Sequence, residues 1–472
     1  LWFVLGFGLV YLISDLSTPV RWSLPLVFAA LALWVTFPVS NEFKWSPYYK
    51  IQFAAAHELY ETGTGKWIRL EKPYGHSVTV NNDYHQIMLD LSKPVPGPTT
   101  TPGEHPMIQD WRRTYDAVHS VDSTLPDGPI LIVGAGTGND VAAALRNTGR
   151  EIYAVEIDPA ILTLGRTFHA EKPYHNPRVH SVVNDARSFL QNTELRFAHV
   201  IFGFLDSHTL LSSFSALRLD NFVYTADSLN RVRSVLLPGG RATISFGVSH
   251  EWIHRRLLGL MNQAFDGTTI FRTQPPGSYV SNGMIYANYR EPLPANIPTK
   301  KVLDPAAPGI DLNLPTDDWP YFYLKAPAIP FHYQGFLAFV LVLCLIPIAL
   351  MPRNRGGAAA YLPYFFLGAG FFLLETSNVV SLSLLYGSTW IVNLVVFSGI
   401  LALILAGNWT QSRLNVLKMA DKNNLFFILL FANLLAAYFT PTAWLLGIGN
   451  APFKAALAIT IFLGPVYFAS LI

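Results

Sequence analysis

Charged residues are distributed very unevenly along this chain of 472 residues, and this limits what it can fold into. Residues 331–472 carry eight of the 64 charged side chains, whereas residues 41–330 carry 54. Because soluble domains contain about 25% charged residues, the C-terminal third is too apolar for an ordinary water-exposed domain. The pattern therefore predicts a polar domain joined to a membrane part, and excludes a disordered chain or a collagen-like repeat.

Seven apolar segments approach the length of about 20 residues that a helix needs to cross a bilayer. Two precede the polar domain, the first of them a partial span, and five follow it. Tryptophan and tyrosine near several segment ends are typical of interfacial belts. Because the chain begins and ends in apolar sequence, we expect a longer polytopic protein, truncated here. The segments are 1–13, 22–39, 331–351, 361–386, 389–408, 425–446 and 453–472.

Glu375 interrupts the apolar segment 361–386 near its middle. A carboxylate in the hydrocarbon core is costly, so such residues face the bundle interior or a polar cavity. Two interpretations stay open. Glu375 makes a structural hydrogen bond to a neighbouring helix, or it forms an intramembrane polar site for a substrate or proton.

Within the polar part, residues 130–247 alternate short apolar runs with helical stretches, which predicts a parallel sheet with crossover helices. The first predicted strand, 129–133, leads directly into Gly134, Gly136 and Gly138, and a helix follows. Glycines let the backbone turn sharply and approach a ligand closely at a helix N-terminus. This arrangement predicts a nucleotide-binding turn.

Acidic residues follow the next strands. Glu156 ends the second strand, 18 residues after Gly138, where an acid can hold the two ribose hydroxyls of a nucleoside. Asp185 follows the third strand and could contact an adenine amino group, and the fourth strand leads to Asp206 and His208. The combination predicts a nucleoside site, and the alternative is a Rossmann-like fold with an empty pocket.

This order of elements resembles the S-adenosylmethionine-dependent methyltransferase fold and, more narrowly, the spermidine synthase family. Residues 45–51 are similar to that family's entry motif, and a small β-region follows them. The resemblance covers about residues 44–290, and two motifs further on are similar to a membrane-fused branch of the family. Besides the glycine turn and the acids, the residues that carry it stand at 45–51, 66–70, 77–82, 373–376 and 385–390.

The resemblance implies an α/β Rossmann-like, methyltransferase-type domain with a small N-terminal β-region, inserted between transmembrane α-helices. It implies that the three glycines form the turn at the donor, that Glu156 holds the ribose and that Asp185 holds the adenine. The donor would be decarboxylated S-adenosylmethionine or S-adenosylmethionine, and no metal is expected.

For the acceptor, the resemblance implies an amine or polyamine. Asp206 would orient or deprotonate it, and His208 is a second catalytic candidate. The substrate-binding candidates are Tyr48, Tyr84, His85 and Asp140.

Two positions depart from the aminopropyltransferase pattern. The acid that this family carries inside its glycine turn is replaced by Thr137, and the first of two acids after the fourth strand is replaced by Gly203. Transfer from a sulfonium needs a neutral amine, whereas a polyamine nitrogen is mostly protonated at pH 7, so carboxylates are required. Asp206 is the acid of this pattern that remains, and by itself it can supply part of the binding and deprotonation of the amine.

Other signals point elsewhere only weakly. His250, Glu251 and His254 spell a zinc motif at helical spacing, but this stretch falls where the transferase fold needs an ordinary amphipathic helix and no third ligand is evident. Residues 94–106 read as a loop or gate over the pocket. The net charge of +2 shows no basic stripe, so no nucleic acid is expected.

The sequence therefore predicts five parts: transmembrane helices at 1–40, the β-region and pocket loop at 41–125, the nucleotide-binding domain at 126–290, a proline-rich linker at 291–330, and a helical bundle at 331–472. The expected function is an integral membrane aminopropyl or other alkyl transferase. The alternatives are a methyltransferase, or a non-catalytic transport or binding protein with a sensory nucleotide domain. The oligomeric state is left open.

Two arguments disagree on which side of the membrane the polar domain lies. With seven straight spans, most flanking arginines and lysines fall opposite the polar domain, so the positive-inside rule favours an external domain. Adenosyl donors are made in the cytosol, which favours a cytoplasmic domain of a plasma-membrane protein. We expect the cytoplasmic side. The charges on the opposite face are Arg21, Arg353, Arg355, Arg413, Lys418 and Lys422.

Overall fold

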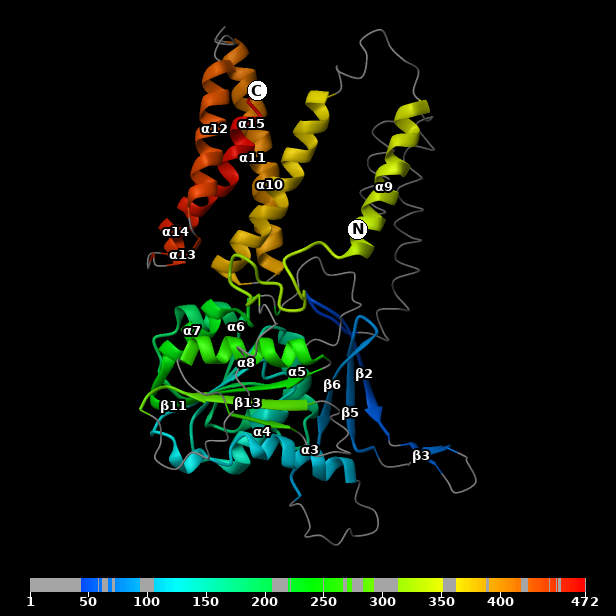
Figure 1. Cartoon of the computed structure of the whole chain (residues 1–472), viewed down its shortest axis with the longest axis vertical. Coiled ribbons are helices and arrows are strands. Elements are labelled where there is room, and N and C mark those ends of the chain that lie inside the picture. The colour runs from blue at the N-terminus through cyan, green and yellow to red at the C-terminus, as the bar shows by residue number, and fades with distance from the viewer. Residues whose placement is uncertain are drawn as a thin grey trace.

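The computed structural model of the chain places an α/β domain beside a bundle of apolar helices (Figure 1). Two of the predicted membrane segments, 1–13 and 22–39, lie outside the described residues, as do Asp206 and His208 and most of the loop 94–106. The described residues are 44–57, 59–61, 67–69, 73–93, 106–205, 220, 222–248, 250–265, 270–273, 283–292, 313–350, 362–387, 390–416, 423–440, 442–446, 448 and 451–471.

The α/β domain is built on a seven-stranded sheet with the order β12-β13-β11-β10-β7-β8-β9. The five strands from β9 to β11 are parallel to one another, while β13 is antiparallel to both β11 and β12. The strands are β7 (Ile130–Val133), β8 (Ile152–Glu156), β9 (Val179–Val183), β10 (Phe197–Phe202), β11 (Leu236–Gly247), β12 (Ile270–Thr273) and β13 (Gly283–Tyr289). This order, with one reversed strand near the edge, is that of the methyltransferase-type Rossmann-like fold, so the predicted α/β fold is confirmed.

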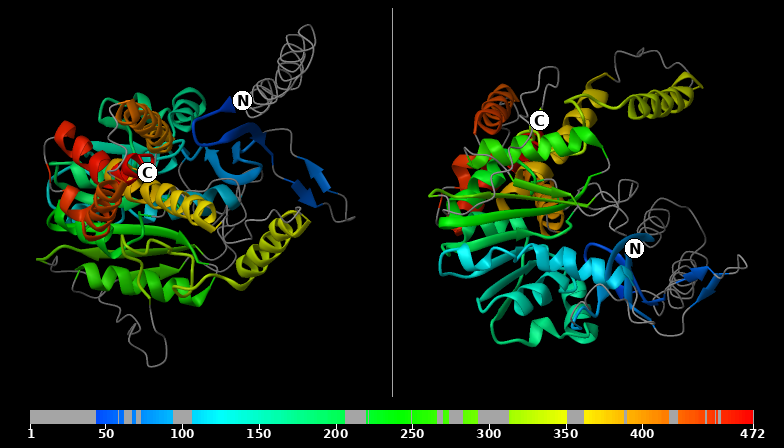
Figure 2. Two further views of the ribbon diagram at one scale, coloured as in Figure 1. Left: turned by 90° about the horizontal axis from the view of Figure 1, so that it is seen from above. Right: turned by 60° about the horizontal axis from the view of Figure 1, so that its bottom comes forward.

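Helices cover both faces of this sheet (Figure 2, right, where the green α8 and the cyan α3 lie on opposite sides of the strands). One face packs on α6, α7 and α8, and the other on α4 and α5. All residues of β7 and β10 are buried, as expected for central parallel strands. The helices are α3 (Pro106–Ala117), α4 (Asn139–Asn147), α5 (Pro159–Phe168), α6 (Ala186–Asn192), α7 (Ala226–Val235) and α8 (Glu251–Phe265).

A small antiparallel sheet precedes the domain, in the order β1-β2-β5-β6. Its apolar side packs on α5, where Ile51 and Val78 meet Ile161 and Leu164. An irregularity in the β5–β6 pairing makes His85 an extra residue between Tyr84 and Gln86. The strands are β1 (Lys44–Trp45), β2 (Lys50–Ala56), β5 (Gly75–Val80) and β6 (Asp83–Leu89), and β3 (Leu59–Glu61) pairs with β4 (Trp67–Arg69) in a separate ribbon.

The C-terminal helices form a separate apolar cluster, in which α10, α11, α12 and α15 pack together while α9 stands to one side (Figure 1). Its core includes Leu382, Val396 and Leu463. The elements are α9 (Phe331–Leu350), α10 (Leu362–Tyr386), α11 (Trp390–Val416), α12 (Asn423–Phe439), α13 (Thr442–Leu446), α14 (Ala451–Ala458), a π-helical turn (Ile459–Leu463) and α15 (Gly464–Ala469).

Within the part of the chain that the structure describes, one helical segment, Gly368–Tyr386, is long and apolar enough to cross a bilayer by length and composition. Three shorter apolar helices, Phe331–Leu343, Leu425–Phe439 and Phe453–Ala469, accompany it. Of the five spans that the sequence predicts within residues 331–472, one meets these criteria. Membrane insertion stays a proposal.

Arg256, a buried arginine, is one of the residues that attach the segment before α9 to the α/β domain. Arg256 of α8 donates to the carbonyl oxygens of Phe322 (2.5 Å), Leu324 (2.6 Å) and Lys325 (2.9 Å). Its guanidinium also lies 4.8 Å from the ring centre of Trp252. The chain leaving the domain is thereby held in place shortly before the helical bundle begins.

Candidate active site

The candidate site lies where the parallel strands β7, β8 and β9 end, the edge at which open α/β sheets bind ligands. Gly134, Gly136 and Gly138 follow β7 with φ of 69°, 55° and 111°. These left-handed angles strain residues with a Cβ atom, which explains the glycines. Gly138 is the N-cap of α4, so the turn leads into a helix N-terminus that can stabilise negative charge.

Glu156 is attached directly to this turn from the end of β8. Its Oε2 accepts the backbone N–H of Gly136 (2.8 Å) and its Oε1 accepts the N–H of Asp158 (2.9 Å). Burial raises the pKa of Glu156 to about 7, although these two backbone bonds favour the carboxylate. The predicted ribose ligand is therefore a buried acid held against the glycine turn.

The entry segment is fixed to the same edge by Ser46. Its hydroxyl donates to Oδ2 of Asp158 (2.6 Å), while Oδ1 of Asp158 accepts the N–H of Ala160 and caps α5. Ser46 Oγ also accepts the N–H groups of Tyr48 (3.1 Å) and Tyr49 (2.8 Å). The local turn that this serine forms sets where the two tyrosines enter the site.

Tyr48 lies within the electrostatic reach of three carboxylates. Burial, followed by the charges of Asp158, Asp185 and Glu156, raises the pKa of Tyr48 to about 12. The same cluster thus contains the predicted ribose acid, the predicted adenine acid and a tyrosine from the entry motif. Asp185 is 2% exposed and caps α6, accepting the N–H of Ser188 at 2.8 Å.

Strand β6 closes the other side of the glycine turn. Gln86 Oε1 accepts both the backbone N–H (3.0 Å) and the hydroxyl (2.9 Å) of Thr137. Asn139, at the start of α4, donates to the carbonyl of Ile87 (2.8 Å) and accepts the N–H of Leu89 (3.1 Å). Position 137, where the resembled family carries an acid, is therefore neutral and bound to a neutral amide.

Asp140 fills the space beside the second departure. A Cβ atom built on Gly203, at the end of β10, would stand 2.7 Å from Oδ2 of Asp140. A side chain at 203 would therefore stand against this carboxylate, which lies directly beside the position where the resembled family carries its acid. Burial raises the pKa of Asp140 to about 7. A carboxyl group is therefore present beside Gly203, and it belongs to a residue of α4 and not to one that follows β10.

Tyr115 lies close to this acid, and Tyr84 lies close to Tyr115. Burial and the charge of Asp140 raise the pKa of Tyr115 well above its usual range, and Tyr84 adds to the effect. Tyr115 Oη accepts a hydrogen bond from Asn139 (3.2 Å). His85 packs against Tyr49, with ring centres 5.8 Å apart. The structure thus brings Tyr84 and Asp140 toward one region, with His85 beside the entry segment.

The predicted catalytic residues Asp206 and His208 lie outside the described residues, so their roles stay predictions. Gly203 and Leu205, which precede them, stand at the end of β10 on the site edge. Glu375 lies in the middle of α10 and is partly exposed. Its role stays a prediction too.

The histidines of the zinc-like motif contact other side chains of the α/β domain. Nδ1 of His254 lies 2.7 Å from the hydroxyl of Tyr286, inside the α8–β13 packing, and His250 stacks on Trp252. Within the described ranges, no group of three or more histidine, cysteine, aspartate or glutamate side chains is placed to hold a metal ion.

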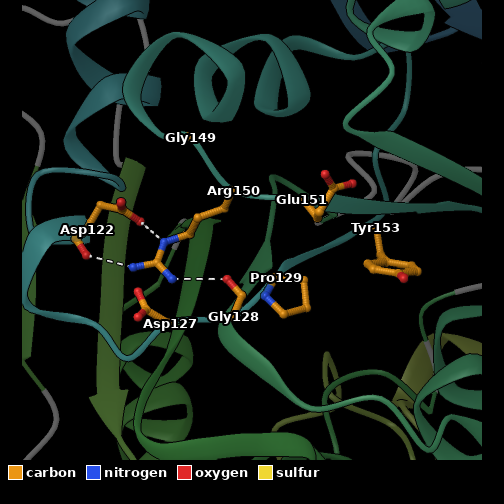
Figure 3. A pocket seen from close by; sticks show the side chains of 8 residues that line it. All are labelled: Asp122, Asp127, Gly128, Pro129, Gly149, Arg150, Glu151 and Tyr153. Carbon is orange, nitrogen blue, oxygen red and sulfur yellow. Dashed lines mark hydrogen bonds and ion pairs between the residues drawn. The ribbon is translucent and has the colours of Figure 1, made fainter.

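A pocket of about 580 Å³ opens on the opposite edge of the sheet (Figure 3). Arg150 occupies one side of it and is held by Asp122 Oδ1 (2.7 Å) and the carbonyl of Gly128 (3.0 Å). Because it lies at the amino ends of β7 and β8, it is on the wrong edge for a ligand held by the glycine turn. The guanidinium is already paired, so we assign this pocket no role.

No individual role was predicted from the sequence for Ser46, Gln86, Tyr115 or Asp158, although Ser46 lies in the entry motif and Gln86 in a polar cluster, residues 81–86, predicted to line the pocket. Asp158 had a usable signal, because an acid followed by proline at the first helical position is a typical helix N-cap. Gln86 and Tyr115 act through partners far away in the sequence, as does the bond of Ser46 to Asp158, so no local pattern marks these contacts.

Comparisons with known proteins show a sequence similarity that covers part of the α/β domain. Residues 112–265 match the model of the spermine/spermidine synthase domain. Polyamine aminopropyltransferase 1 of Streptomyces coelicolor is 30% identical over 146 residues, which span 30% of this chain and 26% of that relative. The match thus covers about a quarter of the relative's length.

Solved structures were compared as well. The spermidine synthase of Thermotoga maritima aligns with 63% of this chain and 89% of its own at 12% identity, with a TM-score of 0.35. A probable spermidine synthase of Corynebacterium glutamicum aligns with 52% and 79% at 15% identity, also with a TM-score of 0.35. By sequence, the α/β domain is similar to the spermine/spermidine synthase domain over residues 112–265.

Proposed function

We propose that this chain is a transferase that moves an aminopropyl group from decarboxylated S-adenosylmethionine to an amine or polyamine. The observation that carries the proposal is the carboxyl group of Asp140, which occupies the volume beside Gly203 where the resembled family carries an acid. The sequence similarity of residues 112–265 supports the same class.

The donor would lie against the glycine turn, with Glu156 on the ribose and Asp185 on the adenine. Glu156 is already fixed by two backbone N–H groups, so its carboxyl group needs no rearrangement before it meets the sugar hydroxyls. The turn ends at a helix N-terminus, and its backbone can approach the ligand closely because three of its residues are glycines.

In the chemical step, the ionised carboxylate of Asp140 accepts a proton from the acceptor ammonium and leaves a neutral amine. The nitrogen lone pair attacks the carbon next to the sulfonium, the carbon–sulfur bond breaks, and sulfur keeps both electrons as the neutral thioether methylthioadenosine. A base with a pKa near the working pH is the most effective in such a step. The raised pKa of Asp140, about 7, suits this role.

We further propose that the helical part lies in a membrane with the transferase domain on its cytoplasmic side. Large apolar side chains that are more than half exposed support this, because water-exposed surfaces rarely gather so many. They lie on four helices, α9 to α12. The residues are Phe336, Leu337, Phe339, Phe372, Leu373, Leu401, Leu405, Ile428 and Phe431.

A second candidate function is methyl transfer from S-adenosylmethionine. The neutral Thr137–Gln86 pair favours it, because no carboxylate in the glycine turn holds the amine of an aminopropyl group. The two candidates share the nucleoside site and differ in which sulfonium the site prefers.

The test compares thermal unfolding of the purified full chain in detergent with methylthioadenosine, S-adenosylmethionine, decarboxylated S-adenosylmethionine or no ligand. A ligand at 100 times its dissociation constant should add about 2.7 kcal/mol of stability. A larger shift with the decarboxylated donor supports aminopropyl transfer, and the reverse preference supports methyl transfer.

Glu156→Gln should lose most of this shift, whereas Glu151→Gln, an exposed acid at the start of the same strand, should keep it. No shift with any of these compounds in well-folded protein would contradict both transferase proposals. A non-catalytic membrane protein with a sensory domain would then be the better description.

A further inference from the structure

We propose that the turn between α10 and α11, at Gly387, is a wall of the nucleoside pocket, so that binding of the adenosyl donor is coupled to the packing of the helical bundle. The inference rests on the proposed function, because it assumes that Asp185 holds an adenine. It adds a specificity-determining position that lies in the bundle and not in the α/β domain.

The direct contact is between Gly387 and Asp185. A Cβ atom built on Gly387 would stand 2.6 Å from Cβ and 3.3 Å from Oδ1 of Asp185. Gly387 has φ of 87°, a conformation that favours glycine. The backbone after α10 therefore lies directly on the acid predicted to read the adenine, and no side chain fits between them.

A second contact joins helix α6, which Asp185 caps, to the linker that precedes α9. Arg187, in the first turn of α6 after Asp185, is 6% exposed and pairs with Oδ2 of Asp317 (2.7 Å). Oδ1 of Asp317 accepts the hydroxyl of Thr225 (2.8 Å), the N-cap of α7. Helix α6 is thus held by the bundle at its N-cap and by the linker two residues later.

On its other side, Asp185 faces the nucleotide cluster. Its charge acts on Tyr48 together with those of Asp158 and Glu156. Asp185 therefore lies near both Tyr48 and the end of α10, and Figure 1 shows the lower end of α10 directly above α6. A nucleoside that contacts Asp185 meets a surface continuous with the bundle.

Coupling between two sites is reciprocal in free energy. If the α10–α11 turn sets the position of Asp185, a change in the turn must alter adenine recognition, and a bound nucleoside must in turn stabilise the turn. This differs from a merely structural contact, which would alter stability while leaving ligand preference unchanged.

The test measures binding of methylthioadenosine and methylthioinosine to the full chain in detergent. The inosine analogue lacks the exocyclic amino group that a carboxylate accepts from. Wild-type protein should bind the adenosine compound at least about tenfold more tightly, the energy of one hydrogen bond to a charged group. Gly387→Ala should weaken methylthioadenosine binding at least about fivefold and bring the two affinities together.

Two glycine variants serve as controls. Gly239→Ala introduces a Cβ at a similar φ of 78°, near the start of β11, where the nearest neighbouring atom is 3.6 Å away, and so reports backbone strain alone. Gly370→Ala lies on α10 itself, with no heavy atom within 4 Å of its Cβ. Both should keep the wild-type preference for adenosine.

The outcomes separate the two proposals. Wild-type discrimination that is retained in Gly387→Ala would overturn this inference and leave the proposed function intact. Binding of neither nucleoside by the wild type would overturn the proposed function, and the inference with it. An equal loss of the preference for methylthioadenosine in Gly239→Ala would also overturn this inference, since backbone strain and not the Gly387–Asp185 contact would then be the cause.

Discussion

At the scale of single residues, the most informative pair is Asp140 and Gly203. The glycine looks like a lost acid in the sequence, but in space it leaves room for a carboxyl group from the neighbouring helix. The same position in the site can thus be filled from β10 or from α4. Whether Asp140 acts as a base is an experimental question with a defined pH signature.

We expect Asp140→Asn to lower kcat/KM for amine transfer by about 10²- to 10⁴-fold, the usual contribution of a general base. Because burial raises the pKa of Asp140 to about 7, its ionised, proton-accepting form is gained as pH rises. Wild-type kcat/KM should therefore increase with pH up to about 7 and then level off, and the variant should lose this limb.

Asp127→Asn is the matched control, since Asp127 is exposed at the opposite edge of the sheet. It should retain both the rate and the pH profile. A wild-type pH profile preserved in Asp140→Asn would assign the base to another residue, with Asp206 as the first candidate.

At the scale of elements, helix α8 does more than cover the sheet. Its Arg256 donates to three carbonyl oxygens of the segment that leads to α9, and it is 2% exposed. This helix carries the zinc-like motif, yet His254 is bound to Tyr286 in the core. The polar side chains of α8 therefore serve packing and attachment.

Arg256→Ala should lower the free energy of unfolding by about 3 kcal/mol or more, because buried carbonyl oxygens lose their donors. Arg256→Lys should also destabilise, since one ammonium group lacks the planar fork that reaches all three. Arg255→Ala, the neighbouring residue in an exposed pair with Glu251, should cost less than about 1 kcal/mol.

Two measurements check the expected stabilities of these variants: thermal unfolding of the full chain and the rate of protease cleavage within residues 313–330. Faster cleavage in the Arg256 variants alone is expected. Equal effects of the Arg255 and Arg256 variants would mean that the linker is held by other contacts.

At the scale of the whole molecule, the α/β domain and the apolar helices meet at α6. The exposed phenylalanines and leucines of α9 to α12 support the proposed membrane location, because a bilayer removes apolar side chains from water. In that location, the contact of Gly387 with Asp185 would lie near the membrane surface.

We expect the full chain to stay in the membrane pellet after alkaline carbonate extraction, since apolar helices in a bilayer are held by hydrophobic burial rather than by charge. With Cys344 replaced by serine, a cysteine at exposed Thr316 should react with an impermeant reagent only after the membrane is opened. Release by carbonate would argue against insertion, and labelling in intact cells would place the domain outside.

Local chemistry in the sequence was sufficient for the five parallel strands within residues 130–247 and for the glycine turn, because apolar runs and glycine turns are properties of neighbouring residues. It also put Glu156 and Asp185 at strand ends. It did not predict the two further strands, β12 and β13, at the edge of the same sheet. Only the tertiary structure brought Asp140 into the volume beside Gly203, Gln86 onto Thr137 and Gly387 onto Asp185. Those contacts depend on how separate elements pack, and no local pattern encodes the distance between residues far apart in the chain.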